Sequence, residues 1–290
     1  MKFSLWTDHG ALNSNAVFSA FAQSCTAAGH QVVYNETESD VDVIWSVLWY
    51  GRMAKNKSIW DRNKKKLKPT IVLEVGGIKR NNTWKVGIGG INRDAYFGDN
   101  NNDSSRAELL RLKLKPWRTE GDHILICGQH ERSLQWDNMP RMIKWTKNTI
   151  ENIQKHTVRP IVIRPHPRCP MPEIELQYNN VYRETPKKTS KDRLDDNYDL
   201  NFKNVWATVS WSSNPGIHSV IEGVPAFTGP SSLAYTVANN DWARIELPIM
   251  PERQQWLNDY AWTEFSIKEI KAGLPLKRLT KVLNDAIIAV

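Results

Sequence analysis

The sequence predicts an α/β protein with two domains, each built around a mainly parallel sheet. Segments typical of buried strands alternate with segments typical of amphipathic helices, which is the pattern of parallel βαβ units. The chain has 290 residues, enough for two domains of about 100–150 residues each. We expect the first domain over residues 1–118, the second over 119–250, and a helical segment over 251–290 that packs back on the first.

In the first domain, runs of apolar and β-branched residues predict strands over residues 2–7, 31–34, 41–46 and 70–75. A helix is expected between the first two strands, because Asn13 or Ser14 can cap it and Gly29 can end it. A basic helix is expected over residues 59–68.

In the second domain, strands are expected over residues 124–127, 161–163, 205–209 and 225–227, and a long helix over 140–156. Pro215 fits the first position of another helix, with Ser213 or Asn214 as its cap, and Gly223 ends that helix. A strand, a hydroxyl-rich turn and a helix start then follow one another. This arrangement is typical of a site for an anion, most simply a phosphate.

These residues resemble the donor-binding half of glycosyltransferases with two Rossmann-like domains facing a cleft, the GT-B type. The closest similarity is to capsule-polysaccharide transferases that transfer Kdo, over roughly residues 120–240. The matching positions are a strand and turn over 124–129, the Arg-Pro-His-Pro pattern over 164–167, and Ser210, Ser212, Ser213, Glu222, Gly223 and Pro225. The resemblance implies a metal-independent transferase whose donor is a nucleotide sugar, with a UDP-sugar expected first.

The predicted donor site combines this resemblance with charge. Arg164 and Arg168 supply guanidinium groups that suit a diphosphate or a sugar carboxylate, and His166 lies between them. A structural histidine is the alternative for His166. The full set of expected donor-binding residues is Gln129, Arg164, His166, Arg168, Ser210, Ser212, Ser213, Asn214, Gly216 and Glu222.

Two acids are candidates for a catalytic base. Ligands of parallel sheets bind outside the carboxyl ends of the strands, and both Asp8 and Glu74 lie at such ends. Asp8 is our first choice and Glu74 the second. Asp40 and Asp42 instead precede a strand, so we discount them as a metal-chelating pair and expect no essential metal.

The predicted acceptor side depends on basic and aromatic residues. Seven basic residues against one acid fall between residues 55 and 68, within a formal net charge of +8. They form either a solvated helix face or a track for a polyanion. The glycine-rich segment over 76–90 is either an acceptor-binding segment or an ordinary connecting loop. The expected acceptor-binding residues are His9, Lys64, Lys65, Lys79, Arg80 and Trp84.

The acceptor is predicted from the size, charge and composition of the chain. Small size, the basic run and asparagine-rich loops give the chain the look of a phage-encoded enzyme, so we expect double-stranded DNA with 5-hydroxymethylated pyrimidines. A capsule, lipopolysaccharide or other glycan is the enzyme alternative, and a non-catalytic DNA-binding protein is the other class. Three separated cysteines and the lack of a 20-residue apolar run predict a cytoplasmic protein without a disulfide framework or a membrane span.

Overall fold

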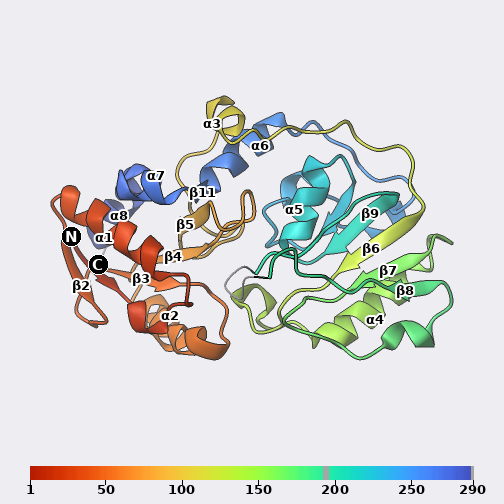
Figure 1. Cartoon of the computed structure of the whole chain (residues 1–290), viewed down its shortest axis with the longest axis horizontal. Helices are drawn as coiled ribbons and strands as arrows, with labels where there is room; N and C mark the ends of the chain where they lie inside the picture. Colours follow the sequence, from red (N-terminus) through yellow and green to blue (C-terminus); the bar gives the residue numbers. More distant parts are fainter. Residues whose placement is uncertain (192–195, 289–290) are drawn as a thin grey trace. The chain divides into compact units, whose positions relative to one another are not determined.

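The computed structural model of the chain describes residues 1–191 and 196–288. It divides into two compact units, Met1–Asp103 with Asp259–Val290, and Ser104–Asn258. Each unit contains one sheet with helices packed on it (Figure 1). The predicted α/β class with parallel sheets is therefore confirmed.

The first unit contains a six-stranded sheet. Its strands are β1 (Lys2–Leu5), β2 (Gln31–Tyr34), β3 (Val41–Trp45), β4 (Thr70–Val75), β5 (Trp84–Ile88) and β11 (Glu264–Phe265). Its helices are α1 (Asn15–Ala27), α2 (Asn56–Lys65), α7 (Ile267–Lys271) and α8 (Leu274–Ile288).

The sheet of the first unit has the order β11-β5-β4-β3-β1-β2. The four strands expected from the sequence pair with one another in parallel. β5 pairs antiparallel with β4, and β11 pairs antiparallel with β5. β5 lies inside the glycine-rich segment that the sequence alone left as a binding segment or a loop. A Cβ on Gly87 would lie 2.8 Å from the Phe97 ring and 2.9 Å from the Gly90 carbonyl. This glycine therefore marks a close approach inside a strand rather than a turn.

Alternate residues of this sheet form one hydrophobic core with α1, α7 and α8. Phe3 and Leu5 of β1 lie in the same buried cluster as Phe21 of α1 and Leu279 of α8. The C-terminal helix thus packs back on the first unit, as expected from the sequence. Asp42 alternates with the core-facing residues of β3, and its carboxylate accepts hydrogen bonds from α2, so α2 covers the opposite face.

The second unit, as far as the structure describes it, has a five-stranded sheet. Its strands are β6 (His123–Cys127), β7 (Ile161–Arg164), β8 (Val181–Arg183), β9 (Val205–Ser210) and β10 (Ala226–Thr228). Its helices are α3 (Ser105–Leu109), α4 (Met142–Ile153) and α5 (Asn214–Ile221), and α6 (Gln254–Tyr260) crosses from this unit to the first.

Every pair of neighbouring strands in the second sheet, of order β10-β9-β6-β7-β8, is parallel. Ile150 of α4 packs in one cluster with Ala207 and Val209 of β9. Thr208 points to the other face, where its hydroxyl donates to Ser219 of α5 at 2.6 Å. α4 and α5 therefore cover opposite faces of the sheet (Figure 1).

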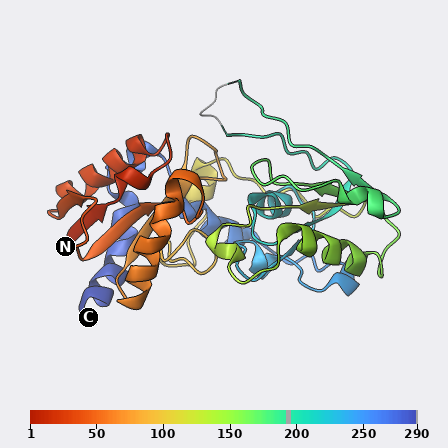
Figure 2. The same cartoon turned by 90° about the horizontal axis from the view of Figure 1, so that it is seen from below.

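The chain leaves the second sheet after β8 and doubles back before β9 (Figure 2). In the described part of this segment between β8 and β9, the Thr189 N–H donates to the Asn197 carbonyl at 3.1 Å. Lys188 and Tyr198 form an isolated antiparallel β-bridge. No helix within residues 1–191 and 196–288 combines the length and the apolar character that crossing a membrane requires.

Candidate functional site

The carboxyl edge of the second sheet gathers four turns that follow β6, β7, β9 and β10. All these strands are parallel, so their carboxyl ends lie at the same edge. Gln129 follows β6 and is 6% exposed, and its side-chain oxygen accepts from Ser212 after β9, from N–H at 3.0 Å and from Oγ at 3.1 Å. Gln129 therefore fixes the turn that leads into α5.

Two histidines lie beside this link. The rings of His130, after β6, and His166, after β7, have centroids 5.7 Å apart and cross at 78°. Nδ1 of His130 accepts from the Arg132 N–H at 3.2 Å, and Nδ1 of His166 accepts from the Arg168 N–H at 3.1 Å. Because Nδ1 is an acceptor in both rings, each neutral imidazole carries its proton on Nε2. The pair thus places two imidazole rings at the carboxyl edge of the second sheet.

The surroundings of His130 change its pKa. Burial, followed by the nearby charges of Arg168 and Arg132, lowers the pKa of His130 below its ordinary value. The ring therefore stays neutral near pH 7. The sequence analysis did not select His130, although its position next to Gln129 in the same turn was the available signal.

The start of α5 offers fewer backbone donors than the sequence suggests. Ser213 is the N-cap residue, but its hydroxyl makes no capping hydrogen bond, Pro215 has no N–H to give, and the Gly216 N–H donates to Ser213 O at 3.1 Å. The dipole of this eight-residue helix still favours negative charge at its start.

Four hydroxyls at the ends of β9 and β10 and in the turns that follow them are buried without a hydrogen-bond partner in the part of the chain that the structure describes. They belong to Ser210, Ser213, Thr228 and Ser231. Ser210 and Thr228 are directly paired at the carboxyl ends of β9 and β10, and they are 1% and 5% exposed. A buried hydroxyl without a partner costs about 1–3 kcal/mol. Ser210, Ser213 and Thr228, which lie at the start of α5 and at the strand ends beside it, are therefore candidates to line a polar ligand site.

Gly216 is required for this arrangement. A Cβ on Gly216 would lie 2.4 Å from Ser210 Oγ and 3.2 Å from Thr228 Cγ2. Only glycine lets the first turn of α5 approach the ends of β9 and β10 this closely. Ser210, Ser212, Ser213, Asn214 and Gly216 of the predicted set therefore lie together.

Arg164 has a different environment from the one expected. It is 6% exposed, and its guanidinium is hydrogen-bonded to the Glu184 carboxylate, to the Asp199 carbonyl and, at 3.2 Å, to Asp199 Oδ1. Arg168 is half-exposed and pairs with Asp196 at 3.3 Å. Arg164 thus holds Glu184 and Asp199, which lie in the segment between β8 and β9. The guanidinium of Arg168 is more exposed to solvent than that of Arg164.

Replacing Arg164 with alanine is expected to lower the free energy of unfolding by roughly 1–3 kcal/mol, because charge-assisted hydrogen bonds are lost while the two carboxylates stay partly solvated. Urea denaturation measures the change. Arg141→Ala is the matched control, since Arg141 is 83% exposed and its Glu131 contact spans 4.0 Å. Equal stability of the two variants would contradict the anchoring role.

Glu222 lies away from the turns. It follows the last residue of α5 and forms an ion pair with Lys115. An eight-residue helix is about 12 Å long, so Glu222 is separated by that distance from the helix start. The structure does not bring Glu222 together with the other predicted donor residues.

The two candidate bases both lie at the carboxyl edge of the first sheet. Asp8 follows β1 and is exposed. Glu74, near the end of β4, is more closely held: Oε2 accepts from Ser46 Oγ at 2.5 Å and Oε1 from the Val75 N–H at 2.8 Å. Ser46 has φ +64° and is 2% exposed. Left-handed backbone at a residue other than glycine costs energy and is concentrated at functional sites. The sequence analysis missed Ser46.

The predicted acceptor residues are spread over the first unit. His9 stacks on the Trp6 ring at 6.2 Å, next to the candidate bases. Lys79 and Arg80 lie in the turn between β4 and β5, whereas Trp84 packs against the hydrophobic core of the unit.

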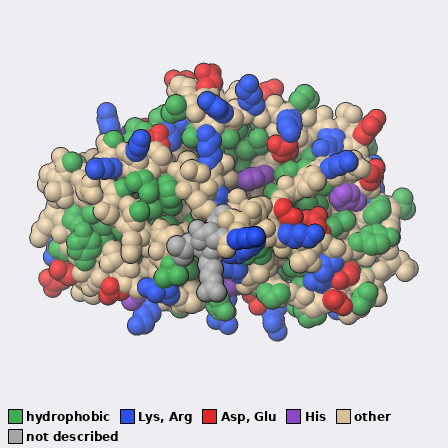
Figure 3. All heavy atoms as spheres, viewed as in Figure 1, with side chains coloured by type: hydrophobic (Ala, Val, Ile, Leu, Met, Phe, Trp, Pro, Cys, Tyr) green, Lys and Arg blue, Asp and Glu red, His purple; other side chains and the backbone are tan. Residues whose placement is uncertain are grey.

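Lys64 and Lys65 lie at the end of α2. One turn earlier, Arg62 pairs with Asp42 at 2.7 Å, at the amino end of β3. These lysines are therefore at the opposite edge of the sheet from Asp8 and Glu74. Lysine and arginine side chains are scattered among acidic ones over the face drawn in Figure 3, without a single basic patch.

Asp42 is fully buried and engaged by Arg62, Asn63 and Lys68. Among residues 1–191 and 196–288, no three histidine, cysteine or acidic side chains cluster as a metal site would need.

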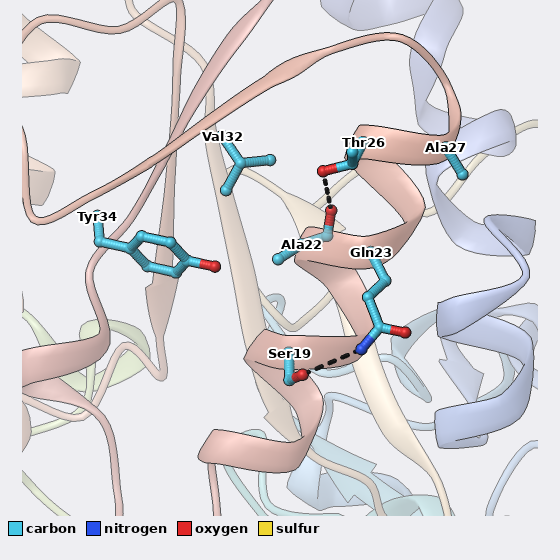
Figure 4. Close-up of a pocket in the computed structure, with 7 residues that line it drawn as sticks. All are labelled: Ser19, Ala22, Gln23, Thr26, Ala27, Val32 and Tyr34. Atoms are coloured by element: carbon cyan, nitrogen blue, oxygen red, sulfur yellow. Dashed lines mark hydrogen bonds between the residues drawn. The ribbon is translucent and has the colours of Figure 1, made fainter.

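A groove of about 560 Å³ opens between α1 and β2, with Tyr34 on one side and Gln23 on the other (Figure 4). None of the predicted site residues lines it.

The fold is similar to solved structures of two transferases from Thermosulfurimonas dismutans. The KpsC beta Kdo 2,7 transferase has a TM-score of 0.57 and 16% identity over 96% of this chain and 99% of that one. The chain has the GT-B fold. The KpsC beta Kdo 2,4 transferase gives 0.53 and 11% over 95% and 98%. No family model and no curated protein matches the sequence. In this GT-B chain, the turn before α5 and the ends of β9 and β10 belong to the second Rossmann-like unit.

Proposed function

We propose that the chain is a glycosyltransferase that moves a sugar from a nucleotide-sugar donor to a hydroxyl group. The observation that supports this most directly is the set of three buried hydroxyls without a described partner, those of Ser210, Ser213 and Thr228, at the start of α5 and the strand ends beside it. A nucleotide sugar supplies a phosphate that such groups can hold. The glycosyltransferase-like fold agrees with this reading, but a fold alone does not carry an activity.

In the proposed reaction, negative charge builds on the leaving phosphate as the bond to the sugar breaks. The hydroxyls of Ser210, Ser213 and Thr228, the imidazoles of His130 and His166, and the Arg168 guanidinium would stabilise that charge. Fixed donors of this kind need no reorganisation during the reaction. A UDP-sugar carrying a hexose or pentose is the donor we would test first.

A carboxylate would take the proton of the acceptor hydroxyl as that oxygen attacks the sugar. We propose Glu74 for this role, with Asp8 as the alternative. Ser46 and the Val75 N–H fix the Glu74 carboxylate, while the Asp8 side chain is exposed. A base that is already oriented loses less entropy in the transition state.

For the acceptor we propose double-stranded DNA with hydroxymethylated pyrimidines, in competition with a glycan. The exposed lysines at the end of α2 favour a polyanion, because Lys64, Lys65 and Lys66 point to solvent. They would contact the phosphate backbone away from the reacting hydroxyl, since they lie at the other edge of the sheet from Glu74. A glycan acceptor would not need these lysines.

The test is a mass-spectrometric assay of a panel of nucleotide sugars against hydroxymethylated DNA, unmodified DNA and oligosaccharides, each at low and high salt. A sugar-sized mass gain on hydroxymethylated nucleosides that falls with salt supports the DNA acceptor, and a salt-insensitive gain on an oligosaccharide supports the glycan. Salt-dependent DNA binding without any nucleotide-sugar binding would instead favour a DNA-binding protein.

His166→Ala should lower kcat about 10²- to 10³-fold in whichever reaction is found, because we propose that its imidazole contacts the leaving phosphate. His156→Ala is the matched control, since His156 is exposed beyond the end of α4. Unchanged turnover in His166→Ala would contradict the donor site.

A further inference from the structure

Three charged residues form a row across the edge strands of the first sheet. Glu74 of β4 is directly paired with Lys85 of β5, and Lys85 is directly paired with Glu264 of β11. Directly opposite residues on neighbouring strands lie on the same face. Lys85 is 3% exposed and Glu264 is fully buried. A buried lysine needs an opposite charge beside it, and the two glutamates supply it.

Burial and the two glutamates change the pKa of Lys85 in opposite directions. Burial lowers the pKa of Lys85, whereas the carboxylates of Glu264 and Glu74 raise it. The row therefore links Glu74 to a residue that follows it by almost two hundred positions in the chain.

Glu264 also holds the turn between β4 and β5. One carboxylate oxygen accepts from the Gly77 N–H at 2.6 Å, and the other accepts from the Ile78 N–H at 2.9 Å and from Thr83 Oγ at 2.7 Å. A Cβ on Gly76 would lie 2.2 Å from Glu264 Oε2. Glycine at position 76 is thus what lets the carboxylate lie under the turn.

We propose that Glu264 is a positioning residue. It holds the turn over residues 76–83, which carries Lys79 and Arg80, and through Lys85 it stabilises the arrangement around Glu74. The effect on Glu74 rests on the proposed function, in which Glu74 is the base, whereas the hold on the turn does not. Because β11 belongs to the segment that returns from the second unit, the site in the first unit is complete only when that segment has docked.

The test uses limited trypsin digestion of the full chain, followed by mass spectrometry of cleavage after Lys79 and Arg80. Glu264→Gln keeps the shape of the side chain but removes its charge and one acceptor oxygen. We expect cleavage in the turn to become about ten-fold faster, because charge-assisted hydrogen bonds hold it closed. Cleavage after Lys64, Lys65 and Lys66 in the same digest should stay unchanged, which separates local opening from unfolding.

Two further variants keep the test decisive. Thr83→Val removes one donor to Glu264 without disturbing the buried charges, and it should also speed cleavage in the turn. Glu269→Gln is the control, since Glu269 lies in the same returning segment but caps α7 with Ser266. Wild-type cleavage in both Glu264→Gln and Thr83→Val, or equal acceleration at Lys64–Lys66, would overturn the hold on the turn.

Activity then tests the link to Glu74. In the transferase assay, Glu264→Gln should lower kcat about ten-fold with KM for the donor unchanged, as expected when positioning rather than binding is lost. Faster cleavage with normal kcat would overturn the link and leave the hold in place. A wild-type chain without transferase activity would refute the proposed function, and the proteolysis result would stand independently.

Discussion

Replacing Glu74 with glutamine is expected to lower kcat about 10²- to 10⁴-fold, which is the usual contribution of a general base. The amide has nearly the same shape as the carboxylate and can still accept from Ser46, but it cannot take the proton of the acceptor hydroxyl. Donor affinity should stay unchanged, because the groups proposed to bind the donor lie in the other unit. Single-turnover kinetics with calorimetric donor titration measure both quantities.

Asp8→Asn is the matched comparison for this variant. Asp8 lies at the same edge of the sheet but is exposed, so we expect a far smaller effect on kcat. If Asp8→Asn abolished turnover while Glu74→Gln retained it, the base would be Asp8, as the sequence ranking had it.

Gly216→Ala is expected to weaken nucleotide binding roughly 10- to 100-fold, since overpacking costs about 1–3 kcal/mol. The new methyl group would overlap Ser210 Oγ and crowd Thr228, so either the hydroxyl rotates out of the site or α5 shifts. The fold should be retained, because alanine is a better helix former than glycine. Isothermal titration with the free nucleoside diphosphate measures the loss.

The double variant Ser210→Ala with Gly216→Ala separates crowding from other effects. Removing Ser210 Oγ takes away the atom nearest to the new methyl group, so part of the affinity should return even though one hydroxyl is missing. Wild-type affinity in the single variant would show that the anion does not lie at the start of α5.

Much of the fold follows from local features of the sequence. The strands β1, β3, β4, β6, β7 and β9 and the helices α1, α4 and α5 each have their own periodicity, cap or terminating glycine. β5 and β11 were not predicted, because their charged residues Lys85 and Glu264 are buried beside partners that lie on other segments, among them each other and Glu74. A partner nearly two hundred residues away leaves no local signal.

The sequence by itself determined the α/β class, the strand-turn-helix segment that ends at Gly223 and the place of the candidate bases at or near the carboxyl ends of their strands, since these depend on neighbours along the chain. Only the tertiary structure decided that Arg164 is committed to Glu184 and Asp199, that Glu222 pairs with Lys115, and that Ser210 and Thr228 lie together beside Gly216. Each of these depends on which distant segments the folded sheet places side by side, and hydrogen bonds and ion pairs form wherever that packing brings their partners within reach.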